Sequence, residues 1–129
     1  MLNYEISGRG KNHLVLLHGF MENLTIWGDM ETHLSDDFTF IKIDLPGHGL
    51  SKNYGEIHSM ELMASEVKKV TDSLNLKQFH LLGHSMGGYT TLAFAEKFPE
   101  VLKSITLFFS SYLPDDTEKK EQRQKSLRI

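Results

Sequence analysis

Hydrophobic residues in this chain gather into short runs, separated by longer stretches in which apolar positions recur every three or four residues. Short apolar runs bounded by turn residues are typical of strands buried inside a sheet. A weaker opening strand is expected over Asn3–Ser7. Buried strands are expected at Leu14–Leu17, Phe38–Ile43, Phe79–Leu82 and Ile105–Phe109.

The longer stretches have the spacing of amphipathic helices. Within Ser59–Leu74, apolar residues repeat at three- and four-residue intervals and therefore share one helix face. Ser59 is suited to cap this helix at its start, and Asn75 can end it in the left-handed conformation. A second helix is predicted from about Ser85 to Phe98, where a proline prevents continuation.

A shorter helix is expected within Trp27–Leu34. Strands that alternate with helices predict an α/β fold, with a mostly parallel sheet and helices on both of its faces. Residues 1–112 are expected to form one core. Asp115 and Glu118 then have the spacing of a helix-capping pair, so residues 113–129 are expected to begin another helix, inside which the sequence breaks off.

Composition and charge narrow the function classes. The 129 residues fit one domain, and 40% hydrophobic with 24% charged residues is typical of a globular protein. The net charge of −3 does not favour nucleic acid as a partner, and the absence of cysteine excludes a thiolate nucleophile. We see no signal peptide and no apolar run near the ~20 residues that span a bilayer, so a cytoplasmic protein that does not bind membranes is expected.

The strongest chemical motif is the pentapeptide Gly83-His84-Ser85-Met86-Gly87, which has the pattern G-x-S-x-G. It lies between a predicted strand and a predicted helix, the position at which a sharp turn exposes a nucleophilic serine above a sheet. The flanking glycines permit the close approach of strand and helix, and the helix N-terminus favours the negative charge of an oxyanion. The alternative is a glycine-rich connection without a chemical role. We predict that Ser85 is a nucleophile.

Two further motifs follow predicted strands. His18-Gly19-Phe20 comes directly after Leu14–Leu17, and its glycine allows a tight turn that can direct the N–H of Phe20 into the site. That N–H and the N–H of Met86 are the predicted oxyanion hole, with His18 close enough to touch the substrate. The segment Asp44–Ser51 predicts a rigid loop, in which Asp44 holds the loop by hydrogen bonds.

These three motifs, HGF, DLPGHGLS and GHSMGG, resemble in sequence and order those of the α/β-hydrolase superfamily, in particular its small esterase-like or lyase-like members. The resemblance covers roughly Asn3 to Ser111. It implies an eight-stranded sheet and a triad in the order serine, acid, histidine, with the acid after a later strand and the histidine near the C-terminus. It also implies a helical cap, whose first helix residues 113–129 would begin.

No histidine follows His84, so the implied base does not occur in these residues. The late strands cannot be formed by the residues after Ser111, so the implied acid does not occur in them either. By the fixed order of the triad, none of the seven histidines is expected to be the base, and His84 is expected to pack or bond locally. Their spacing does not predict a metal site, and no cofactor is expected. The expected function is therefore acyl transfer from an ester-like small molecule, present here as an N-terminal part.

Two kinds of alternative remain open. The same fold and serine serve lyases, C–C bond hydrolases and haloperoxidases, and the chain could also be a pseudoenzyme, a ligand-binding half-domain or one half of a complementing pair. If the chain ends soon after Ile105–Phe109, that strand would lie at an exposed edge of the sheet. An unpaired edge is a template for another chain, so self-association through it is a further prediction.

Overall fold

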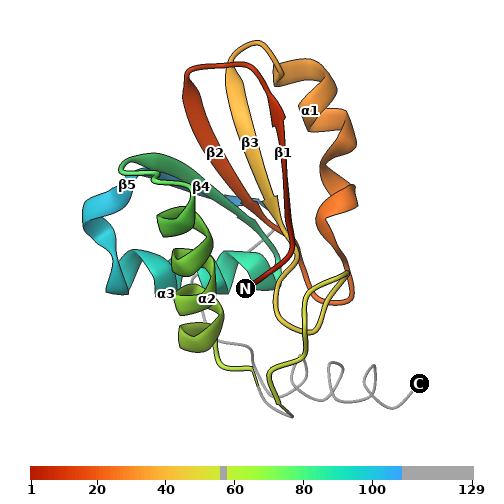
Figure 1. Ribbon diagram of the computed structural model, residues 1–129, viewed down its shortest axis with the longest axis vertical. Helices are drawn as coiled ribbons and strands as arrows, with labels where there is room; N and C mark the ends of the chain where they lie inside the picture. The colour runs from red at the N-terminus through yellow and green to blue at the C-terminus, as the bar shows by residue number, and fades with distance from the viewer. Residues whose placement is uncertain (56–57, 109–129) are drawn as a thin grey trace.

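The computed structural model describes residues 1–55 and 58–108, which form a five-stranded sheet with helices packed on both faces (Figure 1). The helix expected within residues 113–129 lies outside the described residues. The strands are β1 (Tyr4–Gly8), β2 (Asn12–Leu17), β3 (Phe38–Ile43), β4 (Phe79–His84) and β5 (Leu102–Phe108). The helices are η1 (Leu24–Trp27), α1 (Gly28–Leu34), α2 (Met60–Ser73), α3 (Met86–Lys97) and η2 (Pro99–Val101).

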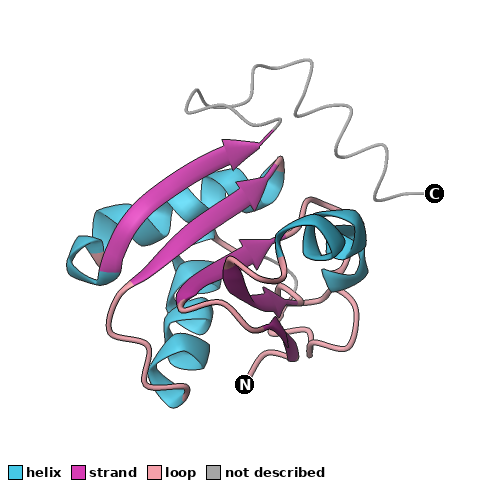
Figure 2. Cartoon of the chain, turned by 90° about the horizontal axis from the view of Figure 1, so that it is seen from above, coloured by secondary structure: helices cyan, strands magenta, loops and turns pink. Residues whose placement is uncertain are grey.

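The sheet has the strand order β1-β3-β2-β4-β5. Only β1 is antiparallel to its neighbour, β3, while the other three pairings are parallel. The predicted α/β class with a mostly parallel sheet is therefore confirmed. Figure 2 shows the helices on both sides of these strands.

Residues that alternate along the strands enter two separate cores. The larger core lies between the sheet and helices α2 and α3, and the smaller one lies between the sheet and α1. Val15 and Leu17 face the larger core, whereas Leu14 and Leu16 of the same strand face the smaller. This assignment follows from the two-residue period of a strand, and it explains why β2 is apolar over four consecutive positions.

Helix α2 begins and ends by the expected signals. The side chain of Ser59 accepts a hydrogen bond of 3.0 Å from the N–H of Leu62, which satisfies one of the unpaired donors of the first turn. Asn75, just beyond the helix, has a φ of 57°, the left-handed conformation that was expected of it. Buried Met63, Val67 and other residues of the apolar face attach the helix to the larger core.

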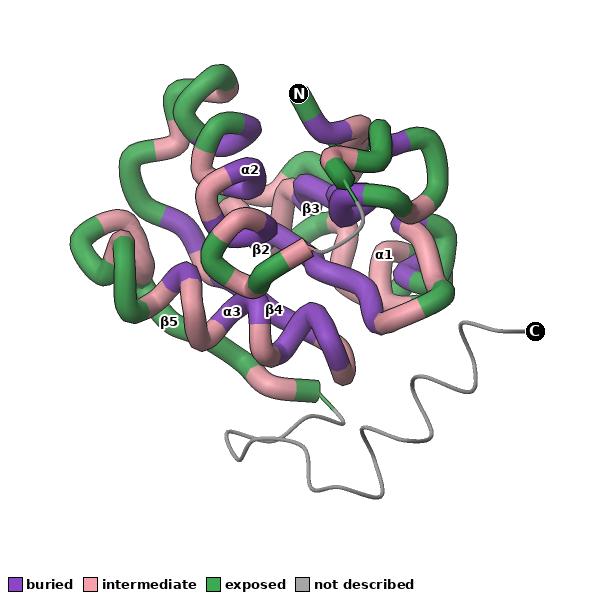
Figure 3. Tube along the Cα trace, turned by 90° about the horizontal axis from the view of Figure 1, so that it is seen from below, coloured by how far each residue is buried: buried purple, intermediate pink, exposed green. Residues whose placement is uncertain are grey.

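The expected burial of strand β5 is wrong. It was predicted to be buried, but most of its residues are exposed, with Ile105 at 38% and Phe108 at 43% (Figure 3). The physical reason is that β5 pairs only with β4 among the described residues, so its other edge has no neighbour there. This is the exposed edge on which the prediction of self-association depends, and association itself stays a prediction. Within the described ranges, no helix has the length and apolar character needed to cross a membrane.

Candidate active site

The parts of the candidate site meet at the topological switch point of the sheet, where consecutive connections leave on opposite sides. Strand β2 lies between β3 and β4, so the chain leaves β2 towards one side of the sheet and later returns on the other. Ligands of open α/β sheets bind at such a point, beyond the carboxyl ends of the strands. The loop after β2 and the turn after β4, which carry the HGF and GHSMGG motifs, are therefore neighbours in space.

Ser85 occupies the turn between β4 and α3 in an unusual backbone conformation. Its φ is 54° and its ψ is −113°, and α3 begins at the next residue. The N–H of Ser85 donates to the carbonyl of Phe108 at 3.2 Å, and its own carbonyl accepts from Gly88 at 2.9 Å. A residue with a side chain held in such a region costs of order 1–3 kcal/mol, and such residues cluster at functional sites.

Two glycines allow strand and helix to approach closely enough for this turn. A β-carbon added to Gly83 would lie 2.2 Å from the carbonyl oxygen of Gly87, and one added to Gly87 would lie 2.2 Å from that of Leu17. Both obstructing atoms belong to the backbone, so they cannot rotate away. The first turn of α3 is consequently packed directly against the ends of β4 and β2.

The HGF loop reaches the serine through Gly19. This residue is buried, and a β-carbon there would lie 3.2 Å from the β-carbon of Ser85. Among the described residues, no hydrogen-bond acceptor faces the backbone N–H of Phe20 or Met86, the two groups predicted to form the oxyanion hole. The structure thus brings together Ser85, the loop of Phe20 and the start of α3, and the oxyanion hole itself stays a prediction.

His18 is placed as a support for this loop. Its ring is 0% exposed, its Nε2 accepts from the N–H of Leu45 at 2.9 Å, and its Nδ1 lies 2.7 Å from the carbonyl of Gly19. Since the carbonyl can only accept, Nδ1 carries the proton. Burial lowers the pKa of His18, which favours this neutral form. The buried ring therefore connects the loops after β2 and β3, and its proximity to a substrate stays a prediction.

Asp44 has the structural role that was predicted for it. It is 2% exposed, and its carboxylate accepts hydrogen bonds from the N–H of Leu24 at 2.8 Å, the N–H of Leu50 at 2.9 Å and the side-chain amide of Asn3 at 2.9 Å. Its carbonyl also accepts from the hydroxyl of Ser51. One side chain thereby fixes both ends of the loop after β3 and the start of η1.

His84 packs locally, as expected, and its main polar partner was not foreseen. Its Nδ1 lies 2.7 Å from the carboxylate of Glu22, and its ring lies against those of Trp27 and Phe108. Glu22 belongs to no recognised motif. The only sequence signal that could have suggested it is its place three residues after Gly19, because a glutamate at this spacing can bond back to the N–H of the first residue, as in a capping box.

Two cavities flank this region and share Glu22 in their walls. One, of about 450 Å³, lies between the HGF loop and the loop that contains His48 and His58. The other, of about 370 Å³, is lined by three apolar residues and Asp29 of η1 and α1, together with His84 and Phe108. Both lie at the carboxyl ends of the strands, where the sheet topology places a ligand.

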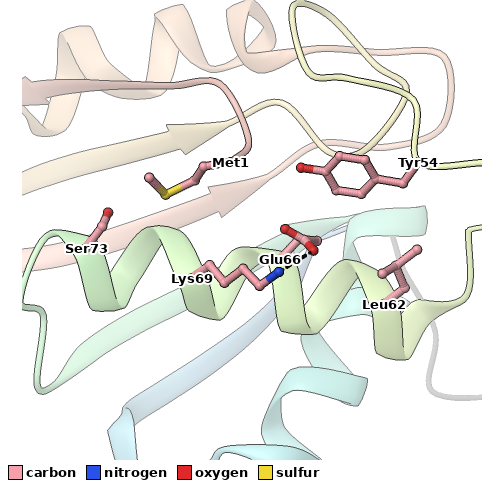
Figure 4. A pocket seen from close by; sticks show the side chains of 6 residues that line it. All are labelled: Met1, Tyr54, Leu62, Glu66, Lys69 and Ser73. Carbon is pink, nitrogen blue, oxygen red and sulfur yellow. Dashed lines mark hydrogen bonds and ion pairs between the residues drawn. The ribbon is translucent and has the colours of Figure 1, made fainter.

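A larger cavity, of about 620 Å³, lies elsewhere on the molecule, between α2 and two residues that face it, Met1 and Tyr54 (Figure 4). Its polar groups are already engaged with one another, because Lys69 pairs with Glu66 at 2.9 Å. Burial, and then the charge of Glu66, raises the pKa of Tyr54. The cavity shares no residue with the loops around Ser85. Within residues 1–55 and 58–108, no group of three metal-ligating side chains converges.

The comparisons with known proteins agree with this geometry. A family model described as the alpha/beta hydrolase fold matches residues 12–125. A serine hydrolase-like protein of Danio rerio is 32% identical over 106 residues, which are 80% of this chain and 32% of that protein. A thermophilic esterase from Thermogutta terrifontis has 34% identity and a TM-score of 0.88 over 96% of this chain and 46% of that one. A marine microorganism esterase has 27% identity and a TM-score of 0.92, over 98% and 49% of the two chains.

The fold and the site therefore define an α/β protein with a serine at a strand-to-helix turn, and the chain belongs to the α/β-hydrolase family. It spans about a third of the length of the curated relative and about half of each solved esterase.

Proposed function

We propose that this chain supplies the nucleophile and the oxyanion-binding groups of a serine esterase that acts on small carboxylic esters. The observation that carries the proposal is the backbone of Ser85, held at a φ of 54° by the close contacts of Gly83 and Gly87. Strain of this kind persists only where the surrounding structure enforces it. Esterases among the related solved proteins support the same reaction class.

In the proposed reaction, the hydroxyl oxygen of Ser85 attacks the ester carbonyl carbon while its proton passes to a general base. The carbonyl oxygen becomes an oxyanion, which accepts hydrogen bonds from the N–H groups of Phe20 and Met86. Collapse of this intermediate breaks the bond to the alcohol, which leaves with the proton. Water then hydrolyses the acyl-serine and releases the acid. The base and its acid partner are assigned to the part of a hydrolase domain that this chain does not span.

The helix that starts at Met86 supports this role for Ser85. Its first N–H groups point towards the turn, and the helix dipole favours negative charge at that end. Loss of a single oxyanion donor typically reduces kcat about 10²–10³-fold, so these donors are expected to contribute substantially beside the serine.

The proposal is tested with the complete gene product that carries this sequence. It is expected to hydrolyse p-nitrophenyl acetate or butyrate and to react with a fluorophosphonate probe, and Ser85→Ala should lose both activities. Ser65→Ala, which removes a hydroxyl from α2 far along the chain from the turn, is the matched control and should keep both. Normal turnover in Ser85→Ala would reject the assignment, and a folded protein that neither turns over esters nor reacts with the probe would favour a binding role.

A further inference from the structure

Glu22 closes the tight turn that carries the Phe20 N–H. Its N–H donates to the carbonyl of Gly19 at 3.2 Å, which makes residues 19–22 a β-turn. Met21, at the third position of this turn, has a φ of 64°. A positive φ at that position is the requirement of a type II turn, which glycine or asparagine usually meets. A methionine therefore adopts this conformation only because other contacts hold the turn.

The carboxylate of Glu22 supplies such contacts to two segments that are distant in sequence. Its Oε1 accepts the N–H of Gly19 at 2.7 Å, and the same oxygen lies 2.7 Å from Nδ1 of His84, 62 residues further along the chain. His84 directly precedes Ser85. One oxygen atom therefore joins the turn that presents Phe20 to the turn that presents the serine.

The second anchor of this bridge is itself fixed. The ring of His84 packs edge-on against Trp27, with centroids 6.5 Å apart and an interplanar angle of 87°, and lies 5.8 Å from the ring of Phe108. Only 22% of the His84 side chain and 30% of the Glu22 side chain are exposed, so water competes weakly for their hydrogen bond.

The bridge also determines which N–H is available to a ligand. The N–H of Gly19 is occupied by the carboxylate, whereas that of Phe20 has no acceptor among the described residues. A β-carbon at Gly19 would lie 2.5 Å from Oε1 of Glu22 and 3.2 Å from the β-carbon of Ser85, so the bridge and the serine lie against the same residue. A shift of the carboxylate would therefore move the donor relative to the nucleophile.

We propose that Glu22 is a positioning residue, which holds the Phe20 N–H in register with Ser85 through its two hydrogen bonds. This inference rests on the proposed function of Ser85, which it deepens. It also assigns the role to the acceptor oxygen and not to the negative charge. A glutamine at position 22 has a carbonyl oxygen that can accept from the same two donors, whereas alanine and leucine have none.

The test compares Glu22→Ala and Glu22→Gln in the complete gene product, with p-nitrophenyl butyrate as substrate and a trifluoromethyl ketone as inhibitor. The inhibitor forms a tetrahedral adduct whose oxyanion reports on the oxyanion hole. Glu22→Ala is expected to lower kcat about 10- to 100-fold with little change in KM, because misplacement of a group by about 1 Å has effects of this size. Inhibitor affinity should fall in parallel. Glu22→Gln is expected to retain most of both.

Further variants make each outcome decisive. Glu22→Leu, which preserves bulk without an acceptor, replaces the alanine variant if urea unfolding shows that the latter is not folded. Glu96→Ala removes an exposed carboxylate from α3 and should leave kcat unchanged. The inference is overturned if the folded acceptor-free variant keeps its kcat and inhibitor affinity, or if Glu22→Gln loses as much as Glu22→Ala. Turnover that survives in Ser85→Ala instead rejects the proposed function, whatever the Glu22 variants do.

Discussion

Replacing Ser85 by glycine and, separately, by alanine would measure the strain stored in the turn after β4. Both variants remove the hydroxyl, so their difference depends on the backbone alone. At a φ of 54° and a ψ of −113°, a residue with a β-carbon costs of order 1–3 kcal/mol, which glycine does not incur. Glycine also loses about 0.4–1 kcal/mol more entropy on folding than alanine. The net expectation is that Ser85→Gly is more stable than Ser85→Ala by about 1 kcal/mol.

A matched pair at Ser65 gives the control. Ser65 lies inside α2, where Lys97 donates to its hydroxyl at 2.8 Å, a bond that both variants lose. In a helix interior, glycine is about 0.8–1 kcal/mol less favourable than alanine, so the order of stabilities should reverse. The two pairs should therefore differ by about 2 kcal/mol in total, since the strain and propensity effects have opposite signs.

Urea unfolding followed by far-ultraviolet circular dichroism would measure these differences. With a slope of about 2 kcal/mol per molar urea, each predicted difference moves the midpoint by about 0.5 M, which is readily resolved. If Ser85→Gly were less stable than Ser85→Ala by the amount found at Ser65, the turn would carry no strain. The backbone of Ser85 would then give no support to a nucleophilic role.

Three other expectations concern the supports of the site. Gly83→Ala should lower the free energy of unfolding by about 3 kcal/mol, because the new β-carbon would lie 2.2 Å from a backbone oxygen of α3. Gly28→Ala, where no atom lies within 4 Å of the new β-carbon, should raise the free energy of unfolding by up to about 1 kcal/mol. Equal urea midpoints for the two variants would contradict this. Asp44→Ala should lower the free energy of unfolding by about 3 kcal/mol in the same assay, since the N–H of Leu24 loses a buried charged acceptor. A decrease below about 0.5 kcal/mol would be inconsistent with that hydrogen bond. Because burial lowers the pKa of His18, the unfolded state binds a proton before the folded state does as pH falls below about 6.5. The free energy of unfolding should therefore decline there by at most about 1.4 kcal/mol per pH unit. His18→Gln should flatten this decline, and an unchanged pH profile in that variant would refute the prediction.

The sequence predicted the elements whose signals are local. The bounds of α2 followed from apolar spacing and from Ser59 and Asn75, both of which behave in the structure as their residue types suggested. The position of Ser85 followed from the glycines that flank it in the motif, although the close contact of Gly87 is with the carbonyl of Leu17, on a strand far away in sequence. In each case, the residues that carry the signal lie within one turn or one strand of each other.

Other features depend on contacts that no local pattern encodes. Glu22 meets His84 only because β2 and β4 are adjacent in the sheet, and a single sequence does not show which of its carboxylates faces a given histidine. The positive φ of Met21 runs against the preference of its residue type, so the residue itself gave no signal for this turn. The exposure of β5 was not predicted. An apolar run indicates that a strand can be buried, but it does not show whether a neighbouring strand or helix covers it.

The position of Trp27 makes its fluorescence a useful probe of this region. It is the one tryptophan of the chain, it is 3% exposed, and its indole borders both His84 and the cavity of about 370 Å³. No group among the described residues accepts a hydrogen bond from its N–H. Indole emission responds to the polarity and the proton-donating groups around the ring. This chain therefore carries an intrinsic fluorophore in the wall of the cavity, and its emission is expected to change if a ligand enters there.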